Sequence, residues 1–247
     1  MKAIIFDFGG TLDLDGIHWS IKFFDAYCRA GLYVPERVFR NAFILSERDM
    51  KGQLSVNAGF QETLFKQVYF QLRHLMEDYN LRFFDEPARI AEKISYECYM
   101  DVKKNVSDTR EILSRLSENY VLGLISNFYG NLKSVMEELE LDEFFSVKMD
   151  SEQTGLRKPD PKAYLYLLDR LSFTPEELVM VGDSYNNDIL PSKNLGLNTI
   201  WLKSGSWDCP EDYSKADFLI GSLTEVEDTV SVMERMNYRK RLLSCLK

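Results

Sequence analysis

The sequence has few cysteines and no long apolar run. Its four cysteines (Cys28, Cys98, Cys209 and Cys245) are scattered and form no Cys-x-x-Cys pair, which argues against a zinc ribbon or a redox motif. A chain of this length does not depend on disulfides, so we expect reduced thiols and a cytoplasmic protein. No apolar stretch approaches the roughly 20 residues of a membrane helix, and residues 1–6 are too short for a signal peptide. We therefore expect no membrane partner.

Positive charge is scarce as well. The 247 residues include 30 Lys and Arg against 39 Asp and Glu, which gives a formal net charge of -9. The summed field of such a chain repels polyanions and argues against a general binder of nucleic acids or anionic membranes. The balance of 45% hydrophobic and 28% charged residues is that of a folded domain, not of a disordered, collagen-like or coiled-coil chain. The length allows one large domain or two of modest size.

Short apolar runs that end in turn residues recur near the start of the chain and throughout its second half. Continuous runs of this length are typical of strands buried on both faces, and therefore of a parallel sheet. Apolar residues at helical spacing lie between most of them, such as Ile112, Leu113 and Leu116. Strands and helices in alternation predict an α/β protein with a layered core. The runs cover residues 3–8, 121–125, 179–181 and 199–202.

The segment from residue 17 to residue 99 has a different pattern. Four stretches show helical periodicity, and none reads as a strand. Pro35 and Pro87 stand where a first-turn proline would begin the second and the fourth stretch. Residues 15–104 carry 13 basic and 13 acidic residues, so the whole negative excess lies outside them. We predict an all-helical domain at 17–99, inserted into a core domain formed by 1–16 and 100–247.

Two of the predicted strands end in small polar residues. Asp7 follows the first apolar run and precedes Gly9 and Gly10, which permit a tight turn and a close approach of the backbone to a ligand. Ser126 and Asn127 follow the second run, where a hydroxyl and backbone N–H groups can hold a phosphate. Ligands of open α/β sheets bind outside the carboxyl ends of the strands. Each motif alone is also ordinary turn chemistry.

Two further motifs complete the set. Lys158 stands in the proline-rich segment 155–161, where a fixed cation can neutralise an anion. Gly182 and Asp183 end a third apolar run, and Asp188 follows five residues later. Hard oxygen ligands at strand ends suit Mg²⁺, which works with phosphates. Four such motifs in this order along an alternating α/β pattern indicate one shared site.

The order of these motifs resembles the haloacid dehalogenase-like hydrolase superfamily, in its phosphatase-like branch. That family carries Asp-x-Asp-Gly-Thr after the first strand, then a Ser or Thr, then a Lys, then Gly-Asp with a further acid. The resemblance covers essentially the whole chain. It implies a Rossmann-like three-layer core with a parallel sheet, and a helical cap inserted after the first motif. The matching residues are Asp7 to Thr11, Ser126, Lys158, Gly182-Asp183 and Asp188.

The resemblance also implies the reaction, the hydrolysis of a small phosphomonoester. Asp7 would attack phosphorus and form an aspartyl-phosphate. Ser126 would bind the phosphoryl oxygens, and Lys158 would orient Asp7 and offset negative charge. A carboxylate approaches an anionic phosphate only where cations reduce the repulsion, so Mg²⁺ is the implied cofactor. The implied metal ligands are Asp7, the carbonyl of Gly9, Asp183 and Asp188, and the implied substrate contacts are Gly10, Thr11 and Asn127.

One position departs from the family pattern. Most members carry a second Asp two residues after the nucleophile, where it protonates the leaving oxygen and then activates water; this chain has Gly9. General acid–base help contributes roughly 10²–10⁴ in rate, and its loss matters most for poor leaving groups. We therefore expect a bias toward anomeric sugar, acyl or aryl phosphates. Asp13 and Asp15 either reach back as a substitute acid or are turn residues in a polar linker.

Other activities stay open as alternatives. A phosphonatase, which breaks a C–P bond, would need a cap lysine as Schiff base, and Lys22, Lys51, Lys66 and Lys93 have no distinctive setting. A dehalogenase of this family breaks a C–halogen bond without metal, so the acids at 183 and 188 argue against it. A phosphomutase depends on the missing acid. A non-catalytic phosphate-binding or interaction protein would have no use for the nucleophile, the lysine and the metal acids.

The cap carries no motif from which a substrate can be named. Trp19, Phe23 and Phe24 have the spacing of helix core residues, although they could line a pocket. His18 and His74 are expected as ordinary linker and helix-surface residues. We expect a small phosphorylated substrate, no nucleic acid or membrane as partner, and a monomer or homodimer.

Overall fold

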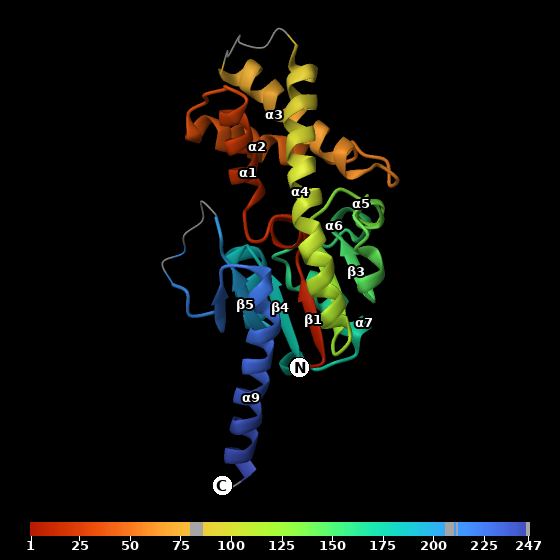
Figure 1. The fold of residues 1–247 in the computed structure, drawn as a ribbon, viewed down its shortest axis with the longest axis vertical. Coiled ribbons are helices and arrows are strands. Elements are labelled where there is room, and N and C mark those ends of the chain that lie inside the picture. The colour runs from red at the N-terminus through yellow and green to blue at the C-terminus, as the bar shows by residue number, and fades with distance from the viewer. Residues whose placement is uncertain (80–85, 206–209, 211, 246–247) are drawn as a thin grey trace.

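The computed structural model describes residues 1–79, 86–205, 210 and 212–245. A layered sheet domain forms one end of the molecule, and a group of helices from the first half of the chain lies above it (Figure 1). The C-terminal helix leaves the sheet domain at the opposite end. Within the described ranges, no helix combines the length and the apolar composition needed to cross a bilayer.

Six parallel strands form one sheet in the order β3-β2-β1-β4-β5-β6. This confirms the predicted α/β fold with a parallel sheet. The patterns indicated four of the strands but not β3 and β6, which are short and lie at the two edges of the sheet, where part of each strand is accessible. The strands are β1 (Ala3–Phe6), β2 (Val121–Ser126), β3 (Val147–Asp150), β4 (Leu178–Gly182), β5 (Asn198–Leu202) and β6 (Phe218–Ile220).

Helices cover both faces of the sheet, so the core has three layers. Ile5 faces a cluster that includes Leu167 of α7 (Pro161–Leu171). Ile4 and Phe6 face the opposite cluster, which includes side chains of α4 (Pro87–Ser117) and α9 (Val226–Cys245). Alternate residues of β1 are therefore buried against different helices, which is why its sequence is a continuous apolar run. The smaller helices are α5 (Leu132–Glu138), α6 (Ser151–Thr154) and α8 (Leu190–Asn194).

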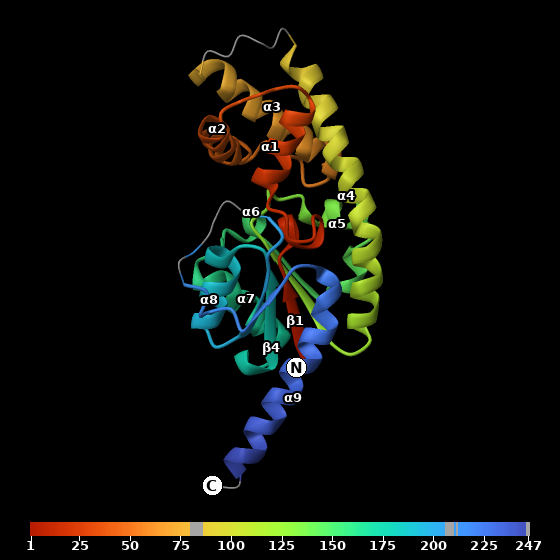
Figure 2. The same cartoon turned by 60° about the vertical axis from the view of Figure 1, so that its left-hand side comes forward.

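The inserted segment is helical, as the periodicity predicted. It contains α1 (Trp19–Arg29), α2 (Glu36–Asp49), α3 (Phe60–Tyr79) and the first part of α4. The fourth helix differs from the prediction, because it continues through the Ile112 to Leu116 stripe that we assigned to a separate helix. It runs from the helical group down along the sheet domain (Figure 2). The predicted boundary at residues 99 and 100 thus lies inside one helix, and the division into two domains stays a proposal.

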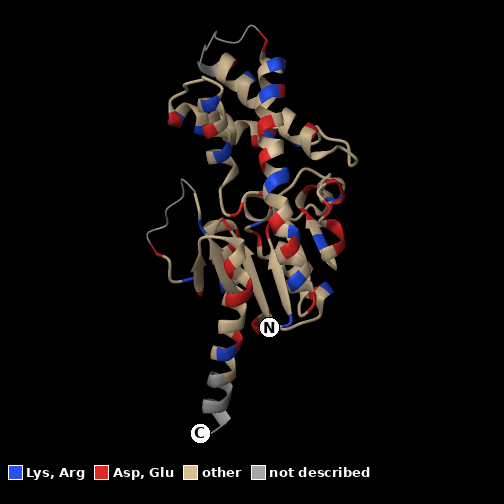
Figure 3. Cartoon of the chain, viewed as in Figure 1, with Lys and Arg blue, Asp and Glu red and all other residues tan. Residues whose placement is uncertain are grey.

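Charged residues lie mostly on the helices and loops. Figure 3 shows Lys and Arg interspersed with Asp and Glu along α4, whereas the strands carry few charges. Cys28 and Cys98 are free thiols, as expected. Cys209 lies outside the described residues, and so does the side chain of Cys245.

Candidate active site

The polar motifs meet at the carboxyl ends of neighbouring central strands. Asp7 follows β1, Ser126 ends β2 and Asp183 follows β4, and these three strands are neighbours. Parallel strands end on the same side of a sheet, so their carboxyl ends bring these side chains together. The three residues line one cavity of about 180 Å³, together with Gly9, Asn127 and Lys158. The sheet thus positions the residues that the sequence motifs singled out.

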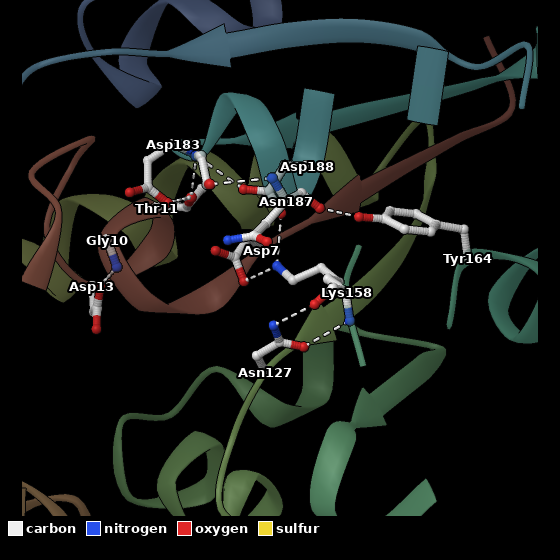
Figure 4. Close-up of polar contacts among 11 residues, drawn as sticks. Asp7, Gly10, Thr11, Asp13, Asn127, Lys158, Tyr164, Asp183, Asn187 and Asp188 are labelled. Carbon is white, nitrogen blue, oxygen red and sulfur yellow. Dashed lines mark hydrogen bonds and ion pairs between the residues drawn. The ribbon is translucent and has the colours of Figure 1, made fainter. Parts of the chain in front are cut away.

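Lys158 joins two carboxylates in the floor of this cavity. Its Nζ lies 2.7 Å from Oδ1 of Asp7 and 2.7 Å from Oδ1 of Asp188 (Figure 4). All three residues are buried. Burial alone would lower the pKa of Lys158, but Asp188 and Asp7 more than offset it, so that pKa lies above its usual range. The lysine is therefore a permanent cation that fixes the Asp7 carboxylate in place.

Asp7, Asp183 and Asp188 form a buried acidic cluster. One oxygen from each lies within 4.8 Å of the others. Burial raises the pKa of Asp7 to about 6, against the lowering effect of Lys158. Burial also raises the pKa values of Asp183 and Asp188, and a neighbouring carboxylate adds to each. Three carboxylates with one ammonium leave negative charge that water does not solvate, which favours a bound cation.

One oxygen of this cluster has no protein partner. Oδ2 of Asp183 is buried and makes no hydrogen bond with any residue that the structure describes. The other oxygen, Oδ1, accepts a bond from the Thr11 hydroxyl at 3.2 Å. An unpaired buried carboxylate oxygen is costly unless something fills its coordination. The donor set is oxygen only, so it fits a hard divalent cation.

Two glycines permit the close packing of these acids. Gly10 has φ +89°, and a Cβ there would lie 2.6 Å from Oδ2 of Asp183. A Cβ on Gly182 would lie 2.5 Å from the side chain of Asp188. Any other residue would push a carboxylate out of the cluster. Gly10 thus acts through Asp183, and neither it nor Thr11 lines the cavity.

Asn127 holds the backbone of the lysine. Its amide N donates to the Lys158 carbonyl at 2.9 Å, and its amide O accepts from the Lys158 N–H at 2.8 Å. This pair of bonds ties the end of β2 to the segment that carries the cation (Figure 4). Both ends of the Asn127 side chain are engaged in this way, although the residue also lines the cavity.

Neither Asp13 nor Asp15 lines the cavity. Asp13 is fully buried and accepts bonds from the Gly10 N–H at 2.6 Å and from the indole N–H of Trp19 at 2.8 Å. Burial raises its pKa to about 8, although both N–H donors act in the opposite direction. Oδ1 of Asp15 accepts from the Leu223 N–H at 2.6 Å. The geometry therefore favours structural roles for both residues over a substitute acid.

The inserted helices supply the other wall of the cavity. His18 caps α1 by accepting from the Ser20 N–H, and it lines the cavity beside Trp19. We expected His18 as an ordinary linker residue and Trp19 as helix core. Sequence reasoning missed the remaining wall residues altogether, because aromatic and polar residues of an amphipathic helix look alike whether they face a core or a cavity. From the helices these are Phe43, Glu47, Phe60 and Gln67, and from the loops Phe128, Tyr129 and Arg157.

The chain is similar in sequence to proteins named as phosphatases. Glyceraldehyde 3-phosphate phosphatase of Pyrococcus furiosus is 37% identical over 140 residues, which are 54% of this chain and 56% of that protein. The chain thus matches little more than half the length of that relative. Phosphoglycolate phosphatase of Vibrio cholerae is 29% identical over 238 residues, which are 92% of this chain and 96% of that protein.

Solved structures share the fold. A dehalogenase with an intermediate complex superimposes with a TM-score of 0.62 at 19% identity, over 92% of this chain and 95% of that chain. A phosphatase from Thermococcus onnurineus gives a TM-score of 0.54 at 21% identity, over 93% and 98%. A family model described as haloacid dehalogenase-like hydrolase matches residues 1–196, a range that holds the whole acidic cluster and Lys158. The chain therefore belongs to the haloacid dehalogenase-like hydrolases.

Proposed function

We propose that the chain is a Mg²⁺-dependent phosphomonoester hydrolase that acts on a small phosphorylated metabolite. The observation that carries the proposal is the position of Asp7. Its carboxylate lines the cavity, lies 2.7 Å from the buried ammonium of Lys158 and shares a cluster with two further acids. Relatives named as phosphatases of glyceraldehyde 3-phosphate and phosphoglycolate support a small phosphoester as substrate.

In the proposed reaction, Asp7 is the nucleophile. One of its oxygens forms a bond to phosphorus while the bond to the leaving oxygen breaks and that oxygen keeps the electron pair. Water then attacks the aspartyl-phosphate, releases phosphate and restores the carboxylate. Lys158 holds Asp7 and offsets charge, and Ser126 at the end of β2 binds a phosphoryl oxygen. Gly10, Thr11 and Asn127 hold these groups in position through the contacts described above.

The proposed metal ligands are Asp7, Asp183, Asp188 and the carbonyl of Gly9. The unpaired Oδ2 of Asp183 and the uncompensated charge of the cluster support this assignment. Bound Mg²⁺ would supply positive charge that lets one anion approach another. Asp188, which also contacts Lys158, would support the metal directly or through water.

The size of the cavity supports a small substrate. At about 180 Å³ the cavity is smaller than the roughly 300–1,000 Å³ that is usual for small-molecule pockets. The cap assignment of residues 17–99, against a core of 1–16 and 100–247, is part of the same proposal.

The alternative reactions have less support from the geometry. Among the described residues, Lys158 is the only lysine that lines the cavity, so no cap lysine is in place for a phosphonatase Schiff base. Lys22 pairs with Asp101 instead, and Lys66 bonds to the Gln53 carbonyl. A metal-free dehalogenase gives no reason for three buried acids in one cluster.

A phosphate-release assay over a panel of phosphomonoesters tests the proposal. We expect release that requires Mg²⁺, stops with EDTA and is lost in Asp7→Asn. Glu36→Gln, an exposed change on α2, is the matched control and should leave release intact. No release from folded, Mg²⁺-saturated protein on any substrate would contradict a phosphatase.

The monomer or homodimer expected from the sequence can be settled by light scattering, and the cytoplasmic location stays a prediction.

A further inference from the structure

Three polar side chains form a hydrogen-bonded group at the cap end of the cavity. Glu47 comes from α2, Gln67 from α3 and Tyr129 from the loop after β2, and all three line the same cavity as Asp7. The amide N of Gln67 donates to Glu47 at 2.7 Å and to the Tyr129 hydroxyl at 2.5 Å. The Tyr129 hydroxyl lies 2.8 Å from both oxygens of Glu47. Three separate elements thus fix one carboxylate.

In this group the hydrogen-bond donors are all used, whereas acceptor sites on Glu47 are not. The amide of Gln67 has two N–H donors, and both are used within the group. The single O–H of Tyr129 is used on Glu47. A carboxylate has about four lone-pair sites, and these bonds do not fill them. The capacity that Glu47 has left is therefore for accepting hydrogen bonds, so it recognises donors on a ligand.

The charge of Glu47 is unexpected in a cavity that must admit a phosphate dianion. A half-buried carboxylate repels that substrate unless the leaving group compensates. Arg157 lines the same cavity, but it is exposed to solvent, where its charge is screened. Burial raises the pKa of Glu47, while the hydrogen bonds from Tyr129 and Gln67 and the charges of Arg157 and His18 lower it and so favour the ionised form. A leaving group with its own negative charge would meet this carboxylate at close range.

We infer that Glu47 selects the leaving group: it binds phosphomonoesters whose leaving group carries hydroxyl or other hydrogen-bond donors and no negative charge, and it rejects those with a carboxylate or a second phosphate. This inference rests on the proposed function. It deepens that function, because the residues at the carboxyl ends of the strands recognise the phosphoryl group and do not discriminate between leaving groups. Gln67 and Tyr129 are positioning residues that act through Glu47.

Two aryl phosphates provide a matched pair of probes. The compounds 3-(hydroxymethyl)phenyl phosphate and 3-carboxyphenyl phosphate have the same size and both release a phenol, but only the second adds a negative charge. Wild-type protein should favour the hydroxymethyl compound by about tenfold in kcat/KM. Glu47→Gln keeps the shape and removes the charge, and should bring the two values to within about threefold. Tyr129→Phe should shift the ratio in the same direction by a smaller factor, and it serves as the second variant if Glu47→Gln does not fold.

Binding separates this inference from the proposed hydrolysis. The affinities of both probes for Asp7→Asn protein, with and without Glu47→Gln, can be measured by calorimetry whether or not either probe is hydrolysed. A hydroxymethyl preference that Glu47→Gln removes supports the inference even if no turnover occurs. A ratio that Glu47→Gln leaves unchanged, or a wild-type preference for the carboxylate, overturns it while leaving the phosphatase proposal intact. Glu36→Gln, on the same helix but outside the cavity, should keep the wild-type ratio.

Discussion

The indole N–H of Trp19 donates to the buried carboxylate of Asp13 across 2.8 Å, and the edge of the same ring lies beside Gly9. A Cβ at position 9 would lie 3.4 Å from Cδ1 of Trp19 and 3.6 Å from its Nε1. Asp13 is held in turn by the Gly10 N–H at 2.6 Å. An aromatic ring with fixed orientation therefore borders the position where most family members carry their acid.

The absence of an acid at position 9 predicts how the rate of hydrolysis depends on the leaving group. Without an acid at position 9, the expelled oxygen leaves unprotonated, so phenyl phosphate should be hydrolysed faster than a simple alkyl phosphate by roughly 10²-fold or more. Initial rates with both compounds, at saturating Mg²⁺, check this. Equal rates would show that another group donates the proton. Asp13→Asn, which keeps the side-chain shape, should not change the ratio of the two rates.

The close approach of Gly10 to Asp183 predicts a large effect of a single methyl group. Gly10→Ala combines a positive φ with a Cβ 2.6 Å from Oδ2 of Asp183. Gly31 has φ +80° and open space around it, so Gly31→Ala isolates the backbone cost, which is about 1–2 kcal/mol. We expect Gly10→Ala to lower the free energy of unfolding by about 2 kcal/mol more than Gly31→Ala, and to lose activity. Denaturant titrations of both variants measure the difference, and equal costs would refute the packing argument.

The two hydrogen bonds between the Asn127 side chain and the backbone of Lys158 predict that Asn127 keeps Lys158 in its position beside Asp7. Asn127→Ala removes both bonds and should cost about 2 kcal/mol of stability and up to about 10²-fold in kcat. Asn127→Asp keeps the acceptor for the Lys158 N–H but places a carboxylate oxygen against the Lys158 carbonyl oxygen, so an effect at least as large as that of Asn127→Ala is expected. If Asn127→Ala raised only KM, a direct contact of Asn127 with substrate would explain the result better.

The raised pKa of Asp7 predicts how stability depends on pH in metal-free protein. Its folded pKa of about 6 exceeds its ordinary value of 3.8, so the native state binds the proton more tightly. The stability from this group is complete below about pH 4 and is lost as pH rises through 6, by about 2–3 kcal/mol. In EDTA, wild-type protein should therefore lose stability relative to Asp7→Asn over this range. Thermal melting from pH 4 to pH 8 tests the sign, and a gain for the wild type would contradict it.

Metal binding should reverse that trend. A cation that binds the native cluster stabilises the protein in proportion to the logarithm of its concentration. Mg²⁺ at neutral pH is expected to raise the Tm of wild-type protein, and Asp183→Asn, which alters the unpaired oxygen, should reduce that shift. Asp217 pairs with Lys193 at an exposed site, so Asp217→Asn is the control and should keep the full shift. A Tm that does not respond to Mg²⁺ would argue against the proposed cofactor.

Much of the molecule could be predicted from local pattern. The continuous apolar run of β1, the helical stripes of the insert and the polar residues after β1, β2 and β4 all follow from the sequence, because burial and turn formation select residue types over a few positions. The continuity of α4 could also have been foreseen, since no Gly or Pro occurs from residue 88 to residue 122. The strands β3 and β6 were harder, because a short edge strand with accessible positions does not produce a continuous apolar run.

By itself, the sequence determined the sheet, the helical insert and the order of Asp7, Ser126, Lys158 and Asp183 along the chain. Only the tertiary structure decided which side chains face the cavity from the other side. Glu47 and Gln67 lie on helices whose periodicity marks a buried face but not what that face is buried against. Their contact with Tyr129 joins positions 62 and 82 residues apart in the chain, and no local pattern encodes such a distance. The substrate preference proposed here depends on that packing.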